Sequence, residues 1–98
     1  MHILLVPRFR RRLSYDDVHW KAIADRLCAD PRDPDALFAR AAYLASEHRM
    51  REAIKSLNVL SEVAPDYPGL WRLKARLFQE MGETKLASAC WKKGYASP

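Results

Sequence analysis

Residues 71–91, WRLKARLFQEMGETKLASACW, decide the fold, because the same pattern of large and small side chains occurs 34 residues earlier. The earlier stretch, residues 37–57, reads LFARAAYLASEHRMREAIKSL. The pairs of positions that keep their size class at this spacing are Leu37 and Trp71, Ala41 and Ala75, Leu44 and Phe78, Ala53 and Ala87, and Leu57 and Trp91. Two prolines, Pro31 and Pro65, have the same separation. A fixed period of this length indicates stacked supersecondary units.

Apolar residues recur at helical spacing along most of the chain, which predicts an all-α fold. We expect five helices, at residues 15–29, 35–46, 50–63, 69–81 and 84–95. Asp33 and Pro34 favour the start of the second helix. Gly82 suits the end of the fourth, because glycine adopts a positive φ without strain. The short turns between these helices predict antiparallel helix-turn-helix units.

The two stretches resemble the tetratricopeptide repeat (TPR) family, whose motif combines bulky, small and aromatic residues at fixed spacing with a later Ala-x3-Phe and a proline. The second repeat reads Trp71-x2-Lys74-Ala75-x2-Phe78, then Gly82, then Ala87-x3-Trp91. The first reads Leu37-x2-Arg40-Ala41-x2-Leu44, then Ala53-x3-Leu57, then Pro65. The departures from the motif are Arg40 and Lys74 in place of leucine, alanine in place of glycine, and His48 in place of the turn glycine.

The resemblance covers residues 14–98 and implies a short right-handed α-solenoid. It divides this region into a half-repeat at residues 14–33, one repeat at 34–67 and another at 68–98. Residues 1–13 precede the repeats, and Pro7 is incompatible with a regular helix interior there. We expect this piece to be a basic N-terminal arm, with its arginines at Arg8, Arg10, Arg11 and Arg12.

In TPR proteins the first helix of each repeat lines a concave groove that commonly binds peptides. The resemblance therefore implies groove residues at Asp35, Phe38, Ala39, Ala42 and Ser46 in the first repeat and at Arg72, Leu73, Arg76, Gln79 and Glu80 in the second. The asparagines of the subclass that grips the C-termini of heat-shock chaperones are absent. Ala42 and Arg76 stand at the corresponding positions.

Arg72 and Arg76 are four residues apart, so both guanidinium groups are expected on one face of a helix. Guanidinium groups bind carboxylates in a bidentate manner. Two interpretations stay open for this pair. The arginines form an anion anchor beside an apolar patch of Phe38, Ala39 and Ala42, or Arg76 simply pairs with Glu80 on the surface.

The residue types of an enzyme or a metal site are present but not in the spacing that such sites need. No serine has a convincing His–Asp arrangement, and no glycine-rich phosphate loop occurs. The three histidines show no ligand spacing to Cys28 or Cys90, which we expect to be reduced, buried thiols. We therefore predict a protein that is not an enzyme, with no catalytic residues, no metal and no cofactor.

The sequence also does not show the pattern of a targeting signal. The apolar run near the start is too short for a secretory signal, and its positive charges follow rather than precede it. No stretch is long enough to span a membrane. We expect a cytoplasmic protein without a membrane span.

Three functions are compatible with this sequence. We favour a non-catalytic interaction module, of the scaffold or co-chaperone kind, that binds a peptide or helix of a partner protein in its groove. A nucleic-acid-binding protein is an alternative because the net charge is +5, but no repeated base-reading pair occurs, so nucleic acid is the less favoured partner. Its cations would be Arg8, Arg10, Arg11, Arg12, Lys92 and Lys93.

The third alternative is a self-associating structural unit. The last expected helix carries more apolar surface than one neighbouring helix can cover, and exposed apolar patches mark interfaces. A two-fold dimer through this helix is the simplest closure. The residues expected at that interface are Leu86, Ala87, Cys90, Trp91 and Tyr95.

Overall fold

The computed structural model describes residues 19–96, apart from the side chains of the last two. Within this range all regular structure is helical and no strand occurs. The elements are a helical segment at residues 19–29, α2 (Pro34–Ser46), α3 (Met50–Val63), α4 (Leu70–Glu80) and α5 (Thr84–Ala96). The all-α prediction is confirmed for these residues. The expected basic arm at residues 1–13 and the expected helix start near residue 15 lie outside the described range.

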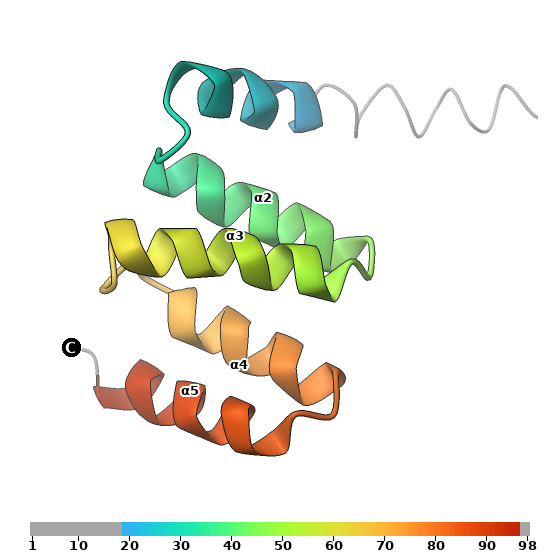
Figure 1. Ribbon diagram of the computed structural model, residues 1–98, viewed down its shortest axis with the longest axis vertical. Coiled ribbons are helices and arrows are strands. Elements are labelled where there is room, and N and C mark those ends of the chain that lie inside the picture. Colours follow the sequence, from blue (N-terminus) through green and yellow to red (C-terminus); the bar gives the residue numbers. More distant parts are fainter. Residues whose placement is uncertain (1–18, 97–98) are drawn as a thin grey trace, which may run out of the picture.

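The helices follow one another in chain order along the longest axis, from segment 19–29 at one end to α5 at the other (Figure 1). The largest contacts join α2 to α3 and α4 to α5, so the chain contains two helical hairpins. Smaller contacts join α3 to α4 and α2 to α4, which places the second hairpin against the first. The first helices of the two hairpins therefore lie beside each other.

The start of α2 shows why the helix begins where the sequence predicts. The side chain of Asp33 accepts a hydrogen bond from the backbone N–H of Ala36 at 3.3 Å, and Pro34 occupies the first helical position. An N-cap carboxylate satisfies a donor that has no partner inside the helix, and proline lacks the donor that would otherwise be left over. The expected start at Asp33 and Pro34 is confirmed.

The two hairpin turns have the same backbone plan. Arg49 N–H donates to the carbonyl of Leu44 at 2.9 Å, and 34 residues later Glu83 N–H donates to the carbonyl of Phe78 at 2.8 Å. The residue inside each turn has a positive φ, 82° at Gly82 and 62° at His48. Glycine adopts this conformation freely, whereas a side chain is strained in it. His48 therefore holds a glycine-type turn without glycine.

The core lies between the helices of each hairpin and between the hairpins. Three of the four alanines that repeat at 34-residue spacing, Ala41, Ala53 and Ala75, have no exposed surface. The fourth, Ala87, is also buried. The prediction that these alanines sit at tight helix contacts agrees with this burial, because interiors are packed without room for larger side chains. The buried leucines around them are Leu37, Leu44, Leu57, Leu60, Leu70 and Leu77.

One buried polar group links α3 to α2. The hydroxyl of Ser56 donates to the carbonyl of Leu37 at 2.9 Å and accepts from Nε of Arg40 at 3.2 Å. Ser56 is buried, so both interactions satisfy groups that water does not reach. The contact gives the guanidinium of Arg40 a polar partner between α2 and α3.

The two cysteines differ, and the expectation of two buried thiols is wrong for one of them. Both are free thiols, but only Cys90 is buried, whereas Cys28 is exposed. On segment 19–29, Ile23 is buried and Leu27 is half-buried against the core. Because successive residues rotate by about 100° around a helix, the position after Leu27 points to solvent.

Candidate functional site

A cleft between α2 and α4 is the candidate site. Its volume is about 290 Å³, and its lining residues are Ala42, Ala45 and Ser46 from α2 and Leu73, Arg76, Leu77 and Glu80 from α4. Ala45, Leu73 and Leu77 are buried or half-buried and form an apolar floor. Ser46, Arg76 and Glu80 are exposed and supply a polar rim. An apolar floor with a few polar groups at its edge is the usual composition of a binding surface.

Half of the expected groove residues meet in this cleft. They are Ala42, Ser46, Leu73, Arg76 and Glu80. Sequence reasoning missed Ala45 and Leu77, although each follows an expected residue by one helical turn and so carried a detectable signal. The contact between α2 and α4 is what brings the two rows of side chains together.

The other five expected groove residues lie elsewhere. Phe38 packs against Tyr67, with ring centroids 5.2 Å apart, and Ala39 is half-buried without lining a described cleft. Arg72 lines a neighbouring cleft of about 260 Å³ together with the loop before α4 and Gly94. Gln79 lines a third cleft, of about 380 Å³, against α5.

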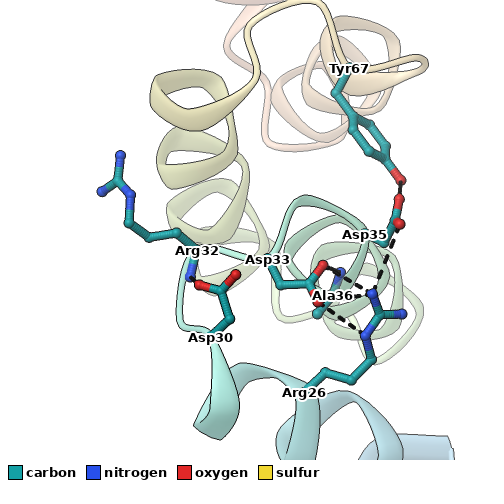
Figure 2. A network of polar contacts seen from close by, with 7 residues as sticks. All are labelled: Arg26, Asp30, Arg32, Asp33, Asp35, Ala36 and Tyr67. Carbon is teal, nitrogen blue, oxygen red and sulfur yellow. Dashed lines mark hydrogen bonds and ion pairs between the residues drawn. The ribbon is translucent and has the colours of Figure 1, made fainter.

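The fifth of these residues, Asp35, belongs to a polar network at one edge of the molecule (Figure 2). The guanidinium of Arg26 contacts the carboxylate of Asp33 through Nε and Nη2, with a shortest distance of 2.8 Å. The same Nη2 lies 3.9 Å from Oδ2 of Asp35, whose Oδ1 accepts a hydrogen bond from the Tyr67 hydroxyl at 2.6 Å. The network ties segment 19–29, the start of α2 and the loop before α4 to one another.

The network shifts two pKa values. Desolvation opposes ionisation of Asp33, but hydrogen bonds from the Ala36 backbone and from Arg26 outweigh it and lower the pKa of this carboxyl. The hydrogen bond to Asp35, together with desolvation, raises the pKa of Tyr67. The lowered pKa favours the ionised carboxylate of Asp33, and the raised pKa favours the protonated hydroxyl of Tyr67; these are the forms that make the hydrogen bonds of the network.

Opposite Phe38, Gly69 precedes α4 with a φ of 84°. A Cβ at this position would lie 3.3 Å from Cζ of Phe38, so a side chain here would be both strained and crowded. Glycine therefore allows the loop before α4 to approach α2 closely. This approach brings Tyr67 within reach of Asp35 and closes the end of the α2–α4 face.

Charged side chains are distributed unequally over the helices. Ion pairs join Lys21 to Asp25, Arg26 to Asp33 and Arg49 to Glu52. Among the described residues, Arg72, Arg76, Lys85 and Lys92 take part in no ion pair. Arg76 and Glu80 line the same cleft, but the surface pair that the sequence left open is not formed between them.

Trp71 is surrounded by cations. Its indole N–H donates to the carbonyl of Pro65 at 2.9 Å, and the ammonium groups of Lys74 and Lys93 lie 5.1 Å and 4.5 Å from the ring centroid. Desolvation lowers the pKa of Lys74 and raises that of the Cys90 thiol beside it. The raised pKa of Cys90 favours the protonated thiol, as expected for a cysteine packed in the core.

Comparison of the chain with protein-family models, with curated proteins and with solved structures found no match. The site is therefore interpreted from its own geometry. Within residues 19–96, no three His, Cys, Asp or Glu side chains gather as they would around a metal ion. No helix in the described range combines the length and the apolar character needed to cross a membrane.

The expected dimer surface on α5 is smaller than the sequence suggested. Ala87 and Cys90 are buried within their own chain, and Trp91 is half-buried. Among the described residues, Leu86 is the large apolar side chain that remains exposed, with 48% of its surface accessible. The side chain of Tyr95 lies outside them.

Proposed function

We infer that this protein is a non-catalytic interaction module that binds a peptide or a helix of another protein. The cleft between α2 and α4 carries this inference, because it combines an apolar floor with an exposed polar rim. A partner that covers Leu73 and Leu77 would gain from their burial, and the rim would fix its orientation.

We also propose that the two hairpins are consecutive repeats of a TPR-like right-handed solenoid. The 34-residue alignment of large and small residues supports this arrangement. The matching turn hydrogen bonds, at Arg49 and at Glu83, support it further. In such a solenoid the first helices of successive repeats form a shared binding surface. Here those helices are α2 and α4, which are in contact.

A matched pair of substitutions tests the interaction module. Ala42 in the cleft and Ala89 on α5 are both exposed helical alanines, and Ala89 lines none of the described clefts. Ala42→Gln fills part of the cleft with a neutral side chain that suits a helix, and Ala89→Gln makes the same change elsewhere. Proteins captured from the native cell extract should be lost with Ala42→Gln and retained with Ala89→Gln. Identical capture by the wild type and both variants would contradict a role for this cleft.

Self-association is a second candidate, favoured by the exposure of Leu86 beside the cleft that Ala87 and Trp91 line. A dimer through α5 would cover Leu86 and raise the sedimentation mass of the 11.3 kDa chain twofold. Leu86→Gln should then return the protein to a monomer. A wild-type chain that stays at 11.3 kDa at tens of micromolar would rule this candidate out.

A further inference from the structure

We propose that the segment bound in the cleft is acidic, and that Arg76 is its principal anchor with Arg72 as the second contact. This inference rests on the proposed function and adds the chemistry of the partner. It follows from the distribution of net charge between the hairpins, from the lack of an ion partner for Arg72 and Arg76 among the described residues, and from the position of Arg76 at the rim of the cleft.

The net positive charge of the described residues comes from the second hairpin. Residues 34–67 carry four Lys or Arg against five Asp or Glu, a net charge of −1. Residues 68–96 carry six Lys or Arg against two Glu, a net charge of +4. Residues 19–33 are neutral, with three of each sign. A ligand in the cleft therefore has a nearly neutral helix on one side and a strongly cationic hairpin on the other.

Arg76 lines the cleft and Arg72, one turn earlier on α4, lines the neighbouring cleft, and neither cation is neutralised within the described residues. Arg72 and Arg76 are exposed and take part in no ion pair there. In the first hairpin, Arg49 lies 2.6 Å from the carboxylate of Glu52 and Arg40 bonds the Ser56 hydroxyl, whereas Arg51 and Lys55 also take part in no ion pair with the described residues and lie away from the cleft lining. Guanidinium groups that have no ion partner among residues 19–96 are available to a carboxylate of another protein.

The geometry of α4 also sets the spacing and direction of the partner. Arg72 and Arg76 are one turn apart, which is about 6 Å along the helix axis. Glu80 lies one further turn along the same row and repels carboxylates at that end. The preferred partner therefore has two carboxylates about 6 Å apart, at i and i+4 of a helix or at i and i+2 of an extended strand. Its apolar side chains would lie over Leu73 and Leu77.

A peptide fits this surface better than nucleic acid does. The cleft floor is apolar and its rim includes the carboxylate of Glu80, which a phosphate backbone would avoid. Lys85 and Lys92 are on α5, away from the α2–α4 floor, so the cations do not form one continuous track over this cleft. A nucleic-acid surface tracks many phosphates with many cations.

The test uses a display library of random twelve-residue peptides, selected on the full chain. Selected peptides should be rich in Asp and Glu at i and i+4 or i and i+2, next to aliphatic residues. Their binding, measured by fluorescence anisotropy, should fall about tenfold with Arg72→Gln plus Arg76→Gln, since hydrogen bonds to charged groups are the stronger class. Lys85→Gln plus Lys92→Gln removes the same net charge from the same hairpin and should change the affinity less than about twofold.

Each other outcome overturns the inference in a recognisable way. Peptides that need Ala42 but lack acidic residues would refute the acidic partner and leave the proposed function standing. Equal losses in the two double variants would show that general attraction, not Arg72 and Arg76, supplies the binding. Tighter binding of a 20-nucleotide single strand than of any peptide, lost with the arginines, would assign these cations to nucleic acid. If the selection yields no peptide whose binding is lost with Ala42→Gln, the proposed function and the inference are both refuted.

Discussion

The two hairpins share a backbone plan but are held together by different side chains. In α2–α3, the buried hydroxyl of Ser56 joins the Leu37 carbonyl to Arg40. At the equivalent positions of α4–α5 stand Cys90 and Lys74. A thiol is a weak donor, so the same link cannot form with the same strength. The second hairpin instead packs two lysine side chains against the ring of Trp71.

The two hairpins also differ in surface charge. The first hairpin has fewer cations than anions, and it pairs Arg49 with Glu52. The second has three cations for each anion, and its Arg72 and Arg76 have no ion partner among the described residues. The two hairpins therefore have side chains of the same size class at their helix contacts, while their polar positions differ. The functional surface is therefore best sought where the hairpins differ.

The largest effect is expected from substitutions at the tightest helix contacts, which test whether the two hairpins pack alike there. Ala41→Leu and Ala75→Leu should each lower the free energy of unfolding by about 1–3 kcal/mol, because both alanines have no exposed surface and overpacking displaces their neighbours. Urea unfolding measures the loss. Ala42→Leu, at the exposed neighbour of Ala41, should change stability by less than about 0.5 kcal/mol. If Ala41→Leu and Ala42→Leu lower the free energy of unfolding equally, Ala41 does not lie at a tight helix contact.

A reciprocal exchange tests the buried polar link. Ser56→Cys should lower the free energy of unfolding by about 1 kcal/mol, because the Leu37 carbonyl and Arg40 lose a strong partner. Cys90→Ser should have a smaller effect, because the new hydroxyl would face the carbonyl of Trp71, the residue equivalent to Leu37. Thermal melts of the two variants give the comparison. A larger loss for Cys90→Ser would show that the hairpins do not share their geometry at this position.

The turns allow a second reciprocal exchange, whose two substitutions should change the free energy of unfolding in opposite directions. His48→Gly should raise the free energy of unfolding by about 0.5–1 kcal/mol, because it relieves a side chain held at a φ of 62°. Gly82→His should lower it by a similar amount through backbone strain, since a Cβ at Gly82 would meet no atom within 4 Å. Chemical denaturation of both variants and of the double exchange measures this. The double exchange should be nearly neutral if the two turns act independently.

The smallest expected effect concerns the network beside the first hairpin. The pKa of Asp33 is lowered in the folded protein, so its contribution to stability is present at neutral pH and is lost as the pH falls through its ordinary and then its folded value. Asp33→Asn keeps an N-cap side chain but removes the ion pair with Arg26. The difference in melting temperature between wild type and variant should therefore be largest at pH 7 and shrink toward pH 3.

Asp25→Asn is the matched control for this measurement, because its ion pair with Lys21 is exposed on both sides. It should show little difference from the wild type at either pH. Parallel melting curves of wild type and Asp33→Asn between pH 7 and pH 3 would mean that the network adds no pH-dependent stability.

The helices could be predicted from the sequence because the signals that define them act over a few residues. The cap at Asp33, the proline after it and the glycine at position 82 each act within one turn of their helix. The apolar periodicity of α3 likewise marks its start at Met50 and its end at Val63. The expected helix boundaries in the described range agree with the observed ones to within one residue. The expected residues that line the α2–α4 cleft follow the same periodicity.

By itself, then, the sequence determined the helices, their repeat of 34 residues and the small residues at their contacts. Only the tertiary structure decided which side chains from different helices meet. Tyr67 reaches Asp35 across 32 positions, and Arg40 reaches Ser56 across 16. These contacts depend on how each helix is rotated and shifted against the next, which the packing of the whole core sets. The exposure of Cys28 and the separation of Arg72 from the cleft of Arg76 have the same origin.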